Sequence, residues 1–592
     1  VSVTRREDGT LVLQSPRPLE PYPRCLGERL DHWARVAPDR PFLGERDGDG
    51  FRVITYGEAR ARVVAVASGL LALGLGPARP VAILSDNSID HAILALGAMH
   101  VGIPAAPVSP AYSLLSGDHA RLSAIVDLLA PGLVFADDPA RYARAIAAIQ
   151  RPGLSVIHDL AALTTAPVDD AAVAQAHAAT GPDTVAKVLF TSGSTGAPKG
   201  VLNTQRMLCS NQQSIAQLWP FLRERPPVLV DWLPWNHTFG GNHNFNMALF
   251  HGGALYIDDG RPAPGLVEKT VASLRAMAPT LYFNVPRGFD ALLPYLEDDA
   301  AFAAHFFSRL DLMFYAAAAL PESLWRRLSD VSLRACGRAV FMSSAWGATE
   351  TAPLVTSVHF PVTRAGVIGL PAPGCELRLV PRDGKLELRV RGPGVTPGYL
   401  HRPDLTAQAF DEEGAYITGD AGAFVDPDAP ARGVVFDGRV AEDFKLGSGV
   451  WVRVGSLRVD LIAAVGACAQ DIVIAGEGGD RLGALIFPGL AACRALVGDA
   501  TLELRELVAH PRVIAEVAAG LARHNAQNPH SSRRIDRALL LAEPPRIDAG
   551  EITDKGYINQ RMTLTRRADA VVRVLSDPPG PEVIVASASA AS

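Results

Sequence analysis

Short, nearly continuous apolar runs alternate with helix-like stretches from about residue 26 to 330. The runs cover residues 80–84, 132–135, 228–231, 254–257 and 281–283. Strands that are apolar on both faces are typical of parallel sheets covered by helices. The pattern therefore predicts an α/β fold with parallel-sheet subdomains over this part of the chain.

After residue 374 the pattern changes to strict alternation of polar and apolar positions. Residues 376–380 and 385–390 alternate on either side of Asp383-Gly384, which is typical of a half-exposed hairpin and predicts a small β-subdomain. Further on, a Pro- and Asp-rich segment precedes a last stretch of strands and helices. We predict three parts: an N-terminal domain at 1–437, a small mobile α+β domain at 438–565, and a partly disordered tail at 566–592.

Composition narrows the possible partners. The formal charge is -6, the pI is about 6.2, and the arginines are scattered, which argues against nucleic acid. Six cysteines without a CxxC pair predict neither a zinc site nor a disulfide framework. The most apolar stretch, 63–78, contains Ser68 and Pro77 and predicts a buried helix and turn. We expect a cytoplasmic protein with no transmembrane segment; its oligomeric state is open, a homodimer included.

A glycine-rich loop follows the strand-like residues 187–190. Residues 190–201 read FTSGSTGAPKGV, in which glycines allow backbone N–H groups to converge, hydroxyls add donors and Lys199 adds a positive charge. Such a loop is suited to a polyphosphate. It differs from the GxxxxGK[ST] loop because Gly200 follows the lysine. For the loop alone, a solvated turn is the competing interpretation.

Further motifs follow in order: WGATE at 346–350, TGD at 418–420, DGR at 437–439 and GEITDKG at 550–556. Together with TSGSTGAPKG they resemble the motifs of the adenylate-forming superfamily, which includes acyl- and aryl-CoA synthetases, peptide-synthetase adenylation domains and firefly luciferase. The resemblance covers about residues 26–565. WLPWNHTFGGNHNFN at 232–246, DGRVAEDFKLGSGVWV and GEITDKGYINQR are similar to the feruloyl-CoA synthetase group.

The resemblance implies a ligase that couples a carboxylic acid to AMP from ATP, releases pyrophosphate, and then transfers the acyl group to the thiol of CoA. It implies ATP, Mg²⁺ and CoA as cofactors and a small-molecule acid as substrate. Because two anions must meet, catalysis depends mainly on charge neutralisation and positioning.

The resemblance also assigns the nucleotide-binding residues. Those around the phosphates are Thr191, Ser192, Gly193, Ser194, Thr195, Gly196, Lys199 and Thr349. Those around the rest of MgATP are Glu350 for Mg²⁺, Trp346 and Gly347 for adenine, Asp420 for ribose, and Arg439 for ribose or phosphate. Taken singly, Trp346 would be a core aromatic, Asp420 a turn residue and Arg439 a surface charge. Their order in the chain favours the ligand roles.

The acid is expected beside His237, which the resemblance places near the carboxylate and the CoA thiol as a binding group rather than a general base. The predicted pocket residues are Trp235, Phe239, Phe283, Asn284, Ala316, Ala317 and Ala345. Small walls leave room for a flat ring and favour an aromatic or hydroxycinnamic acid, while a long fatty acid stays an alternative. The alanines could equally pack a strand against a helix.

The sequence departs from the superfamily at two places. Glu551 stands where many members have the catalytic lysine, so we assign that role to Lys555, with a surface lysine as the alternative. The hinge position holds Ala441 followed by Glu442, and we expect rotation between Arg439 and Asp443.

Three alternatives stay open. One is a medium- or long-chain fatty acyl-CoA synthetase, and another is an adenylating enzyme that passes the acyl group to a carrier protein or to oxygen. The third, of a different class, is a nucleotide-binding pseudoenzyme, suggested by Glu551 and Ala441.

Overall fold

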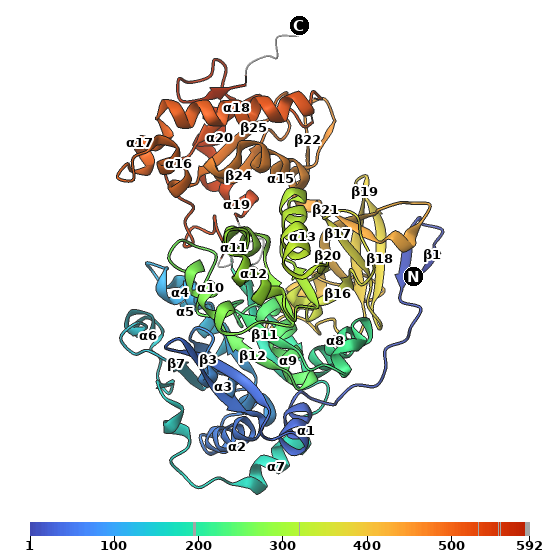
Figure 1. Cartoon of the computed structure of the whole chain (residues 1–592), viewed down its shortest axis with the longest axis vertical. Helices are drawn as coiled ribbons and strands as arrows, with labels where there is room; N and C mark the ends of the chain where they lie inside the picture. The colour runs from blue at the N-terminus through green and yellow to red at the C-terminus, as the bar shows by residue number, and fades with distance from the viewer. Residues whose placement is uncertain (193–196, 319, 531, 554–555, 557, 587–592) are drawn as a thin grey trace.

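The computed structural model describes residues 1–592 except 193–196, 319, 531, 554–555, 557 and 587–592. Figure 1 shows a large N-terminal part that ends with β21 (Val434–Arg439) and a smaller C-terminal domain, orange to red, at one end of it. The predicted fold class is confirmed: α/β subdomains, a β-rich subdomain and a small α+β domain follow one another along the chain.

A six-stranded sheet forms the first α/β subdomain. Its strands, in order, are β10 (Pro198–Thr204), β9 (Val185–Ser192), β6 (Ala105–Pro107), β5 (Val81–Leu84), β7 (Leu133–Ala136) and β8 (Ser155–Ile157). Every neighbouring pair is parallel except β9 and β10. The strands β5 and β7 are buried throughout, as the apolar runs predict. Helix α2 (Tyr56–Ala72) includes most of the stretch predicted to be a buried helix and packs on α3 (Ile89–His100).

The second α/β region carries strands whose ends lead into predicted site residues. A four-stranded sheet has the order β11 (Val228–Asp231), β12 (Ala254–Ile257), β3 (Pro41–Asp47) and β4 (Gly50–Thr55). Next to it, β13 (Leu281–Asn284), β14 (Leu312–Tyr315) and β15 (Phe341–Gly347) are parallel. Because ligands bind beyond the carboxyl ends of parallel strands, the segments after β14 and β15 are well placed for a site.

The predicted hairpin forms the centre of the β-subdomain. Strands β18 (Glu376–Arg382) and β19 (Lys385–Arg391) are antiparallel, and Arg382 pairs with Lys385, so the turn has two residues. Asp383 and Gly384 have φ of 49° and 74°, the conformation that Asp-Gly favours in tight hairpins. The chain's first strands, β1 (Ser2–Arg5) and β2 (Leu11–Gln14), extend this sheet through β18.

The C-terminal domain has its own sheet and its own core. The sheet order is β24 (Ala469–Ala475), β25 (Gly483–Pro488), β26 (Arg537–Leu540) and β27 (Ile584–Val585). Helices α15 (Val454–Val465) and α18 (Pro511–Gln527) pack on each other beside it and contribute Leu461, Val517 and Leu521 to the core. This core is separate from that of the N-terminal part.

The predicted tail at 566–592 is wrong in its extent. Helix α20 (Ala568–Leu575) buries Ala570 and Val574, which lie one turn apart and face β25, and β27 pairs with β26. The C-terminal domain therefore includes these segments, while residues 587–592 lie outside the described part. Among the described helices, none is both long and apolar enough to cross a membrane.

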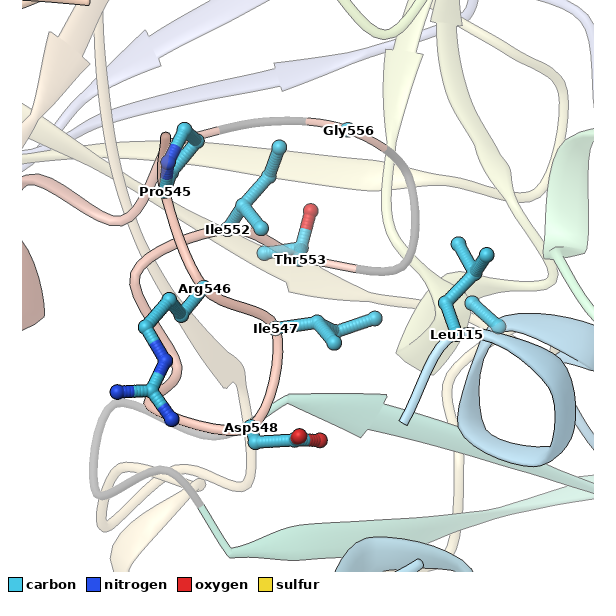
Figure 2. A pocket seen from close by; sticks show the side chains of 9 residues that line it. Leu115, Pro545, Arg546, Ile547, Asp548, Ile552, Thr553 and Gly556 are labelled. Carbon is cyan, nitrogen blue, oxygen red and sulfur yellow. The ribbon is translucent and has the colours of Figure 1, made fainter. Parts of the chain in front are cut away.

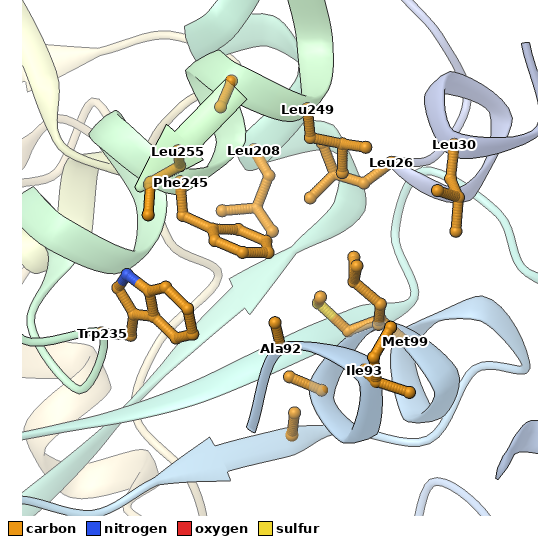
Figure 3. Close-up of a cluster of buried hydrophobic side chains, with 14 of the residues drawn as sticks. Leu26, Leu30, Ala92, Ile93, Met99, Leu208, Trp235, Phe245, Leu249 and Leu255 are labelled. Atoms are coloured by element: carbon orange, nitrogen blue, oxygen red, sulfur yellow. The ribbon is translucent and has the colours of Figure 1, made fainter. Parts of the chain in front are cut away.

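A large buried cluster joins the two α/β regions, and Figure 3 shows part of it. In this view Trp235 lies against Phe245, with ring centroids 4.9 Å apart. Leu208 of α8 (Gln205–Leu218) and Ile93 of α3 come from opposite sides of the same cluster. The two regions thus share one core, which fixes the cleft residues carried by both.

Candidate active site

The base of the glycine-rich loop is an antiparallel hairpin. Strands β9 and β10 pair so that Thr191 lies opposite Lys199, and the next pair toward the tip is Ser192 and Pro198. The predicted ligands Gly193, Ser194, Thr195 and Gly196 lie outside the described residues, as does the side chain of Ser192. The hairpin holds both ends of the loop at a fixed separation.

Lys199 and Glu350 lie on either side of a tyrosine that the sequence analysis missed. The Lys199 ammonium is 4.9 Å from the ring centre of Tyr399, whose hydroxyl donates to Glu350 Oε1 at 3.0 Å. Glu350 is buried in the 3₁₀ turn Thr349–Thr351, and its carbonyl accepts from Thr396 N–H at 2.8 Å. Burial raises the pKa of Tyr399, so it stays a donor to the carboxylate. A carboxylate is thereby held near the loop lysine.

Trp346, Asp420 and Arg439 come together from three strands of the β-rich sheet. The Trp346 indole N–H donates to Asp420 Oδ2 at 2.9 Å. Asp420 and Arg439 are paired positions of β20 (Tyr416–Phe424) and β21, and Arg439 Nε lies 3.3 Å from Asp420 Oδ1. Asp420 Oδ1 is buried, and its ion pair with Arg439 lacks the geometry of a hydrogen bond. Burial raises the pKa of Asp420, while Arg439 and the indole N–H oppose the rise.

Two glycines are required for this arrangement. A Cβ on Gly347 would lie 1.7 Å from the Pro353 carbonyl oxygen, so any side chain would displace the turn that carries Thr349 and Glu350. Gly419 has φ of 72°, a left-handed conformation that side chains disfavour, immediately before Asp420. The motif glycines thus shape the backbone around the charged residues.

A chain of buried polar side chains runs from Gly241 to Thr349. Lys187 Nζ donates to the Gly241 carbonyl at 2.7 Å and to Asn242 Oδ1 at 3.2 Å. Asn242 donates to Asn203 Oδ1 at 2.6 Å, and Asn203 reaches the Thr349 carbonyl at 3.5 Å. Burial lowers the pKa of Lys187 to about 7. The sequence analysis named only Thr349 among these residues.

The segment after His237 forms a π-helix, Phe239–Asn244, which leads into α9 (Phe245–His251). In such a helix some carbonyls lack their usual partners. Here Gln212 Nε2 donates to the carbonyls of Asn242 and His243 at 2.9 and 3.1 Å. Lys187 does the same for Gly241. These contacts satisfy the irregular backbone.

An aromatic cluster surrounds the inner side of the π-helix. The ring of His243 lies 5.2 Å from those of Phe283 and Phe314, 5.8 Å from Phe239 and 6.2 Å from Trp219. The structure therefore brings together Phe239 and Phe283, both predicted for the acid pocket, and adds His243, Phe314 and Trp219. The repeated aromatic and His positions of WNHTFGGNHNFN were the available signal for His243.

The other predicted pocket residues have different surroundings. Trp235 packs in the core against Phe245 and His91, apart from the ring contacts around His243. Asn284 is buried and its side-chain oxygen accepts from Trp232 Nε1 at 3.2 Å, while its amide nitrogen donates to Tyr282. Trp235 and Asn284 thus have partners of their own in this structure, and their place in the acid pocket stays a prediction. His237 is half-buried, with Asn236 Nδ2 3.4 Å from its Nε2.

The predicted alanines lie at the ends of β14 and β15. Ala316 and Ala345 are half-buried, and Ala317 is exposed. Ala317 has φ of 74°, a left-handed conformation that costs free energy for a residue with a Cβ. The segment after β14 is therefore held in a strained form beside the partly exposed Phe239 and Ala345.

The predicted hinge lies in a 3₁₀ turn, Val440–Glu442, immediately after β21. Asp443 follows it with a buried carboxylate that forms an ion pair with Lys385 of β19. The same carboxylate accepts from Val454 N–H at 3.0 Å and lies 3.3 Å from Arg453. Asp443 thus connects the β-subdomain to the first helix of the C-terminal domain.

Glu551 is explained by the structure. It is buried and accepts from Arg567 Nε at 2.6 Å and from Arg546 N–H at 2.9 Å. Its side chain therefore stabilises the loop within the C-terminal domain. Lys555 lies outside the described residues.

The same loop approaches the N-terminal part. Asp548 Oδ2 accepts from Gly117 N–H at 3.0 Å. A cavity of about 490 Å³ lies between Leu115 and the loop residues 545–548, 552–553 and 556, as Figure 2 shows. Ile547 and Ile552 line it on the loop side. In this arrangement the last motif is docked against the first α/β subdomain.

Comparison with known proteins assigns the family. The model of AMP-binding enzymes matches residues 30–400, and the chain belongs to this family. The predicted superfamily and enzyme class, an AMP-forming acid–thiol ligase, are confirmed with it. The finer likeness to the feruloyl-CoA synthetase group is not specifically shown.

Similar proteins include several ligases. A methyl-dioxo-octahydroindenyl-propanoyl:CoA ligase of Mycobacterium tuberculosis is 30% identical over 422 residues, covering 68% of this chain and 77% of the relative. The long-chain-fatty-acid–CoA ligase FadD15 of Mycobacterium bovis is 26% identical, covering 93% and 98%. Among solved structures, the anthranilate CoA ligase AuaEII with anthranoyl-AMP has a TM-score of 0.70 at 20% identity, covering 93% and 98%. At that identity the likeness concerns the fold.

Proposed function

We propose that this protein activates an aromatic carboxylic acid of hydroxycinnamic, feruloyl-like type with ATP and transfers the acyl group to CoA. The observation that carries the proposal is the pairing of a polar cradle, Trp346, Asp420 and Arg439, with an aromatic cluster formed by β13, β14 and the π-helix. The cradle suits a nucleotide, and the cluster suits a flat ring. AMP-binding family membership links the two in one reaction.

At the nucleotide end, Asp420 accepts hydrogen bonds from the ribose hydroxyls. Its buried Oδ1 retains acceptor capacity, since among the described residues it forms an ion pair with Arg439 and accepts no hydrogen bond. The Trp346 indole N–H donates to Asp420. This hydrogen bond fixes the plane of the indole ring and leaves the face of the ring for adenine. Arg439 is largely exposed and adds positive charge toward ribose or phosphate.

At the phosphates, Thr191 and Lys199 flank the loop that holds the pyrophosphate group. Glu350 fits Mg²⁺, a hard cation that prefers carboxylate oxygen and would neutralise phosphate charge there. Its carboxylate is buried and oriented by Tyr399, which leaves one edge for a cation. Thr349 lies in the same turn and contacts phosphate in this proposal.

In the first half-reaction, a carboxylate oxygen of the acid attacks the α-phosphorus, and pyrophosphate leaves with the electron pair of the broken P–O bond. Lys555 stabilises the charge that converges there. In the second, the CoA sulfur attacks the acyl carbon, AMP leaves, and the thiol proton passes to solvent. His237 binds at this junction, and rotation at Ala441 and Glu442 exchanges the two lid positions.

The aromatic preference draws support from the rings of Phe239, Phe283 and Phe314. Offset and edge-to-face ring contacts favour a planar aromatic guest over a flexible chain. A solved relative of the same fold holds anthranoyl-AMP, an aromatic acyl-adenylate. Half-buried Ala316 and Ala345 leave the approach free of large side chains.

The test is AMP release measured with and without CoA for ferulate, 4-coumarate, benzoate and octanoate. We expect CoA-dependent AMP formation that is fastest with the hydroxycinnamic acids. Preference for octanoate would indicate a fatty acyl-CoA synthetase instead. AMP release at the same rate with and without CoA would indicate another acyl acceptor. ATP binding without acid-dependent pyrophosphate release would indicate a pseudoenzyme.

A further inference from the structure

Two buried polar atoms in the aromatic cluster have no hydrogen-bond partner among the described residues: His243 Nε2 and Trp219 Nε1. The exposed fractions of the two residues are 1% and 4%, so solvent does not reach these atoms. Their rings lie 6.2 Å apart and nearly perpendicular. Buried polar groups are nearly always paired, so two unpaired ones in adjacent rings require an explanation.

The protonation pattern of His243 follows from its neighbours. Asn244 Nδ2 donates to Asp231 Oδ2 at 2.9 Å, which directs the Asn244 oxygen toward His243 Nδ1, also at 2.9 Å. Burial raises the pKa of Asp231 to about 7, so above that pH the carboxylate only accepts. Nδ1 of His243 therefore carries the proton and Nε2 is an acceptor. Burial also lowers the pKa of His243 to about 4, which keeps the ring neutral.

The two unpaired atoms are complementary. The Trp219 indole nitrogen can only donate, whereas Nε2 of neutral His243 accepts. A hydroxyl group both donates and accepts, so one hydroxyl satisfies both atoms. The rings of Phe283 and Phe314 contact each other, with centres 5.3 Å apart, and present an apolar wall beside His243.

One ring of the cluster, that of Phe239, is not fully buried. Phe239 is half-buried and contacts both His243 and Phe314, at 5.8 and 5.6 Å between ring centres. Ala316, which follows Phe314's strand and packs on the same core, is also half-buried. Entry of a substrate ring beside Ala316 therefore requires a side-chain movement of Phe239.

We propose that His243 and Trp219 recognise a hydroxyl on the aromatic ring of the acid: the hydroxyl donates to His243 Nε2 and accepts from Trp219 Nε1–H. This inference rests on the proposed function and narrows it to hydroxyaryl acids. Discrimination is strong because an unsubstituted ring leaves both buried atoms unpaired. His243 and Trp219 act on specificity and take no part in bond making.

The experiment compares 4-hydroxycinnamate with cinnamate at pH 8, by calorimetric binding and by kcat/KM for CoA-dependent AMP formation. We expect the wild type to favour the hydroxylated acid in both. His243→Leu should lower its binding and kcat/KM by about 10- to 100-fold and change those of cinnamate less than threefold. Trp219→Phe keeps an aromatic ring and should lower the same preference by about fivefold. His251→Leu, a buried histidine on α9, is the matched control and should leave the preference unchanged.

An unchanged preference in both variants would overturn the proposal and indicate that only a buried water bridges the two atoms. Equal binding of the two acids by the wild type would overturn it as well. If no acid supports AMP formation but the calorimetric preference is present and is lost in His243→Leu, the proposed ligase reaction fails while the hydroxyl site stands. If His243→Leu does not fold, the preference of Trp219→Phe for 4-hydroxycinnamate over cinnamate tests the proposal.

Discussion

The nucleotide end and the acid end of the proposed active site differ in their chemistry. At the nucleotide end, Asp420 and Arg439 carry charges, and the arginine side chain is 61% exposed. At the acid end, Phe283, His243 and Trp219 are buried and neutral. An exposed cation such as Arg439 attracts and releases an anion at little cost in free energy, whereas desolvated neutral groups discriminate sharply between similar rings. The difference suggests that affinity for ATP and selectivity for the acid can be altered separately.

The largest expected effect concerns the proposed step that joins the acid to AMP. Lys555→Ala should reduce acyl-adenylate formation by about 100- to 1,000-fold, because an ammonium stabilises the charge that converges on the α-phosphate. Conversion of supplied acyl-adenylate to acyl-CoA should stay within about threefold, since the lid has rotated by then. Pyrophosphate release and acyl-CoA formation, measured separately, check this.

Lys445→Ala is the matched control for Lys555→Ala, because this lysine also lies in the C-terminal domain and stacks on Trp451, 4.9 Å from its ring centre. It should leave both half-reactions unchanged. A parallel fall of both half-reactions in Lys555→Ala would show that the lysine is structural or that one lid position serves both steps.

At the nucleotide end alone, Asp420→Ala should raise the KM for ATP by about 10- to 100-fold, the equivalent of about 1.5–3 kcal/mol of charge-assisted hydrogen bonding. The KM for the acid should not change. Initial rates at varied ATP check this, with Asp426→Ala, which removes a surface partner of Arg432, as the control. An equal rise in the KM for ATP and in the KM for the acid would show that Asp420 contributes to the binding of both substrates.

The same carboxylate predicts a pH dependence. Because burial raises the pKa of Asp420, it protonates at a higher pH than an ordinary aspartate and then loses acceptor capacity. The KM for ATP should therefore rise as pH falls toward that pKa, and Asp420→Asn should abolish the dependence. A pH profile that is the same in wild type and variant would assign the titration to another group.

At the acid end alone, Phe239→Ala should raise the KM for the acid by about tenfold, because about 1.5 kcal/mol of ring contact and apolar burial is lost. The KM for ATP should not change. Phe221→Ala, on a surface turn over which Arg225 lies, is a suitable control. If ATP binding weakens instead, Phe239 belongs to the nucleotide end.

The smallest effect is expected from Trp346→Phe. The ring remains for adenine, but the hydrogen bond that orients Asp420 is lost, so the KM for ATP should rise by about two- to fivefold. ATP titration followed by initial rates checks this. A change as large as that of Asp420→Ala would mean that the indole N–H contributes more than orientation.

The fold was largely predictable because its main signals are local. The strands β5 and β7 are apolar at every position, and Asp383-Gly384 prescribes its own turn. The structure of the tail was not predictable, because α20 buries only Ala570 and Val574 while Val572 is exposed. Its helical face is too narrow to distinguish from a polar linker without knowing that β25 covers it.

The site divides in the same way. Trp346, Asp420 and Arg439 stand in motifs, so the sequence alone suggests them as ligands. Tyr399 and His243 are important only through their neighbours: Tyr399 through Glu350 and Lys199, and His243 through the amide of Asn244. The contacts of Tyr399 join residues far apart in the chain, and the tautomer of His243 depends on how Asn244 is held by Asp231. Both follow from tertiary packing, which no local pattern encodes.

One connection of strand β10 bears on how the site moves. Leu202 N–H donates to the Gly398 carbonyl and Leu400 N–H to the Gly200 carbonyl, at 3.2 and 2.8 Å. Tyr399 sits between them, in contact with both Lys199 and Glu350. Lys199, Tyr399 and the turn that carries Glu350 are thus held on two hydrogen-bonded segments, so we expect a displacement of β10 to shift the Glu350 carboxylate as well.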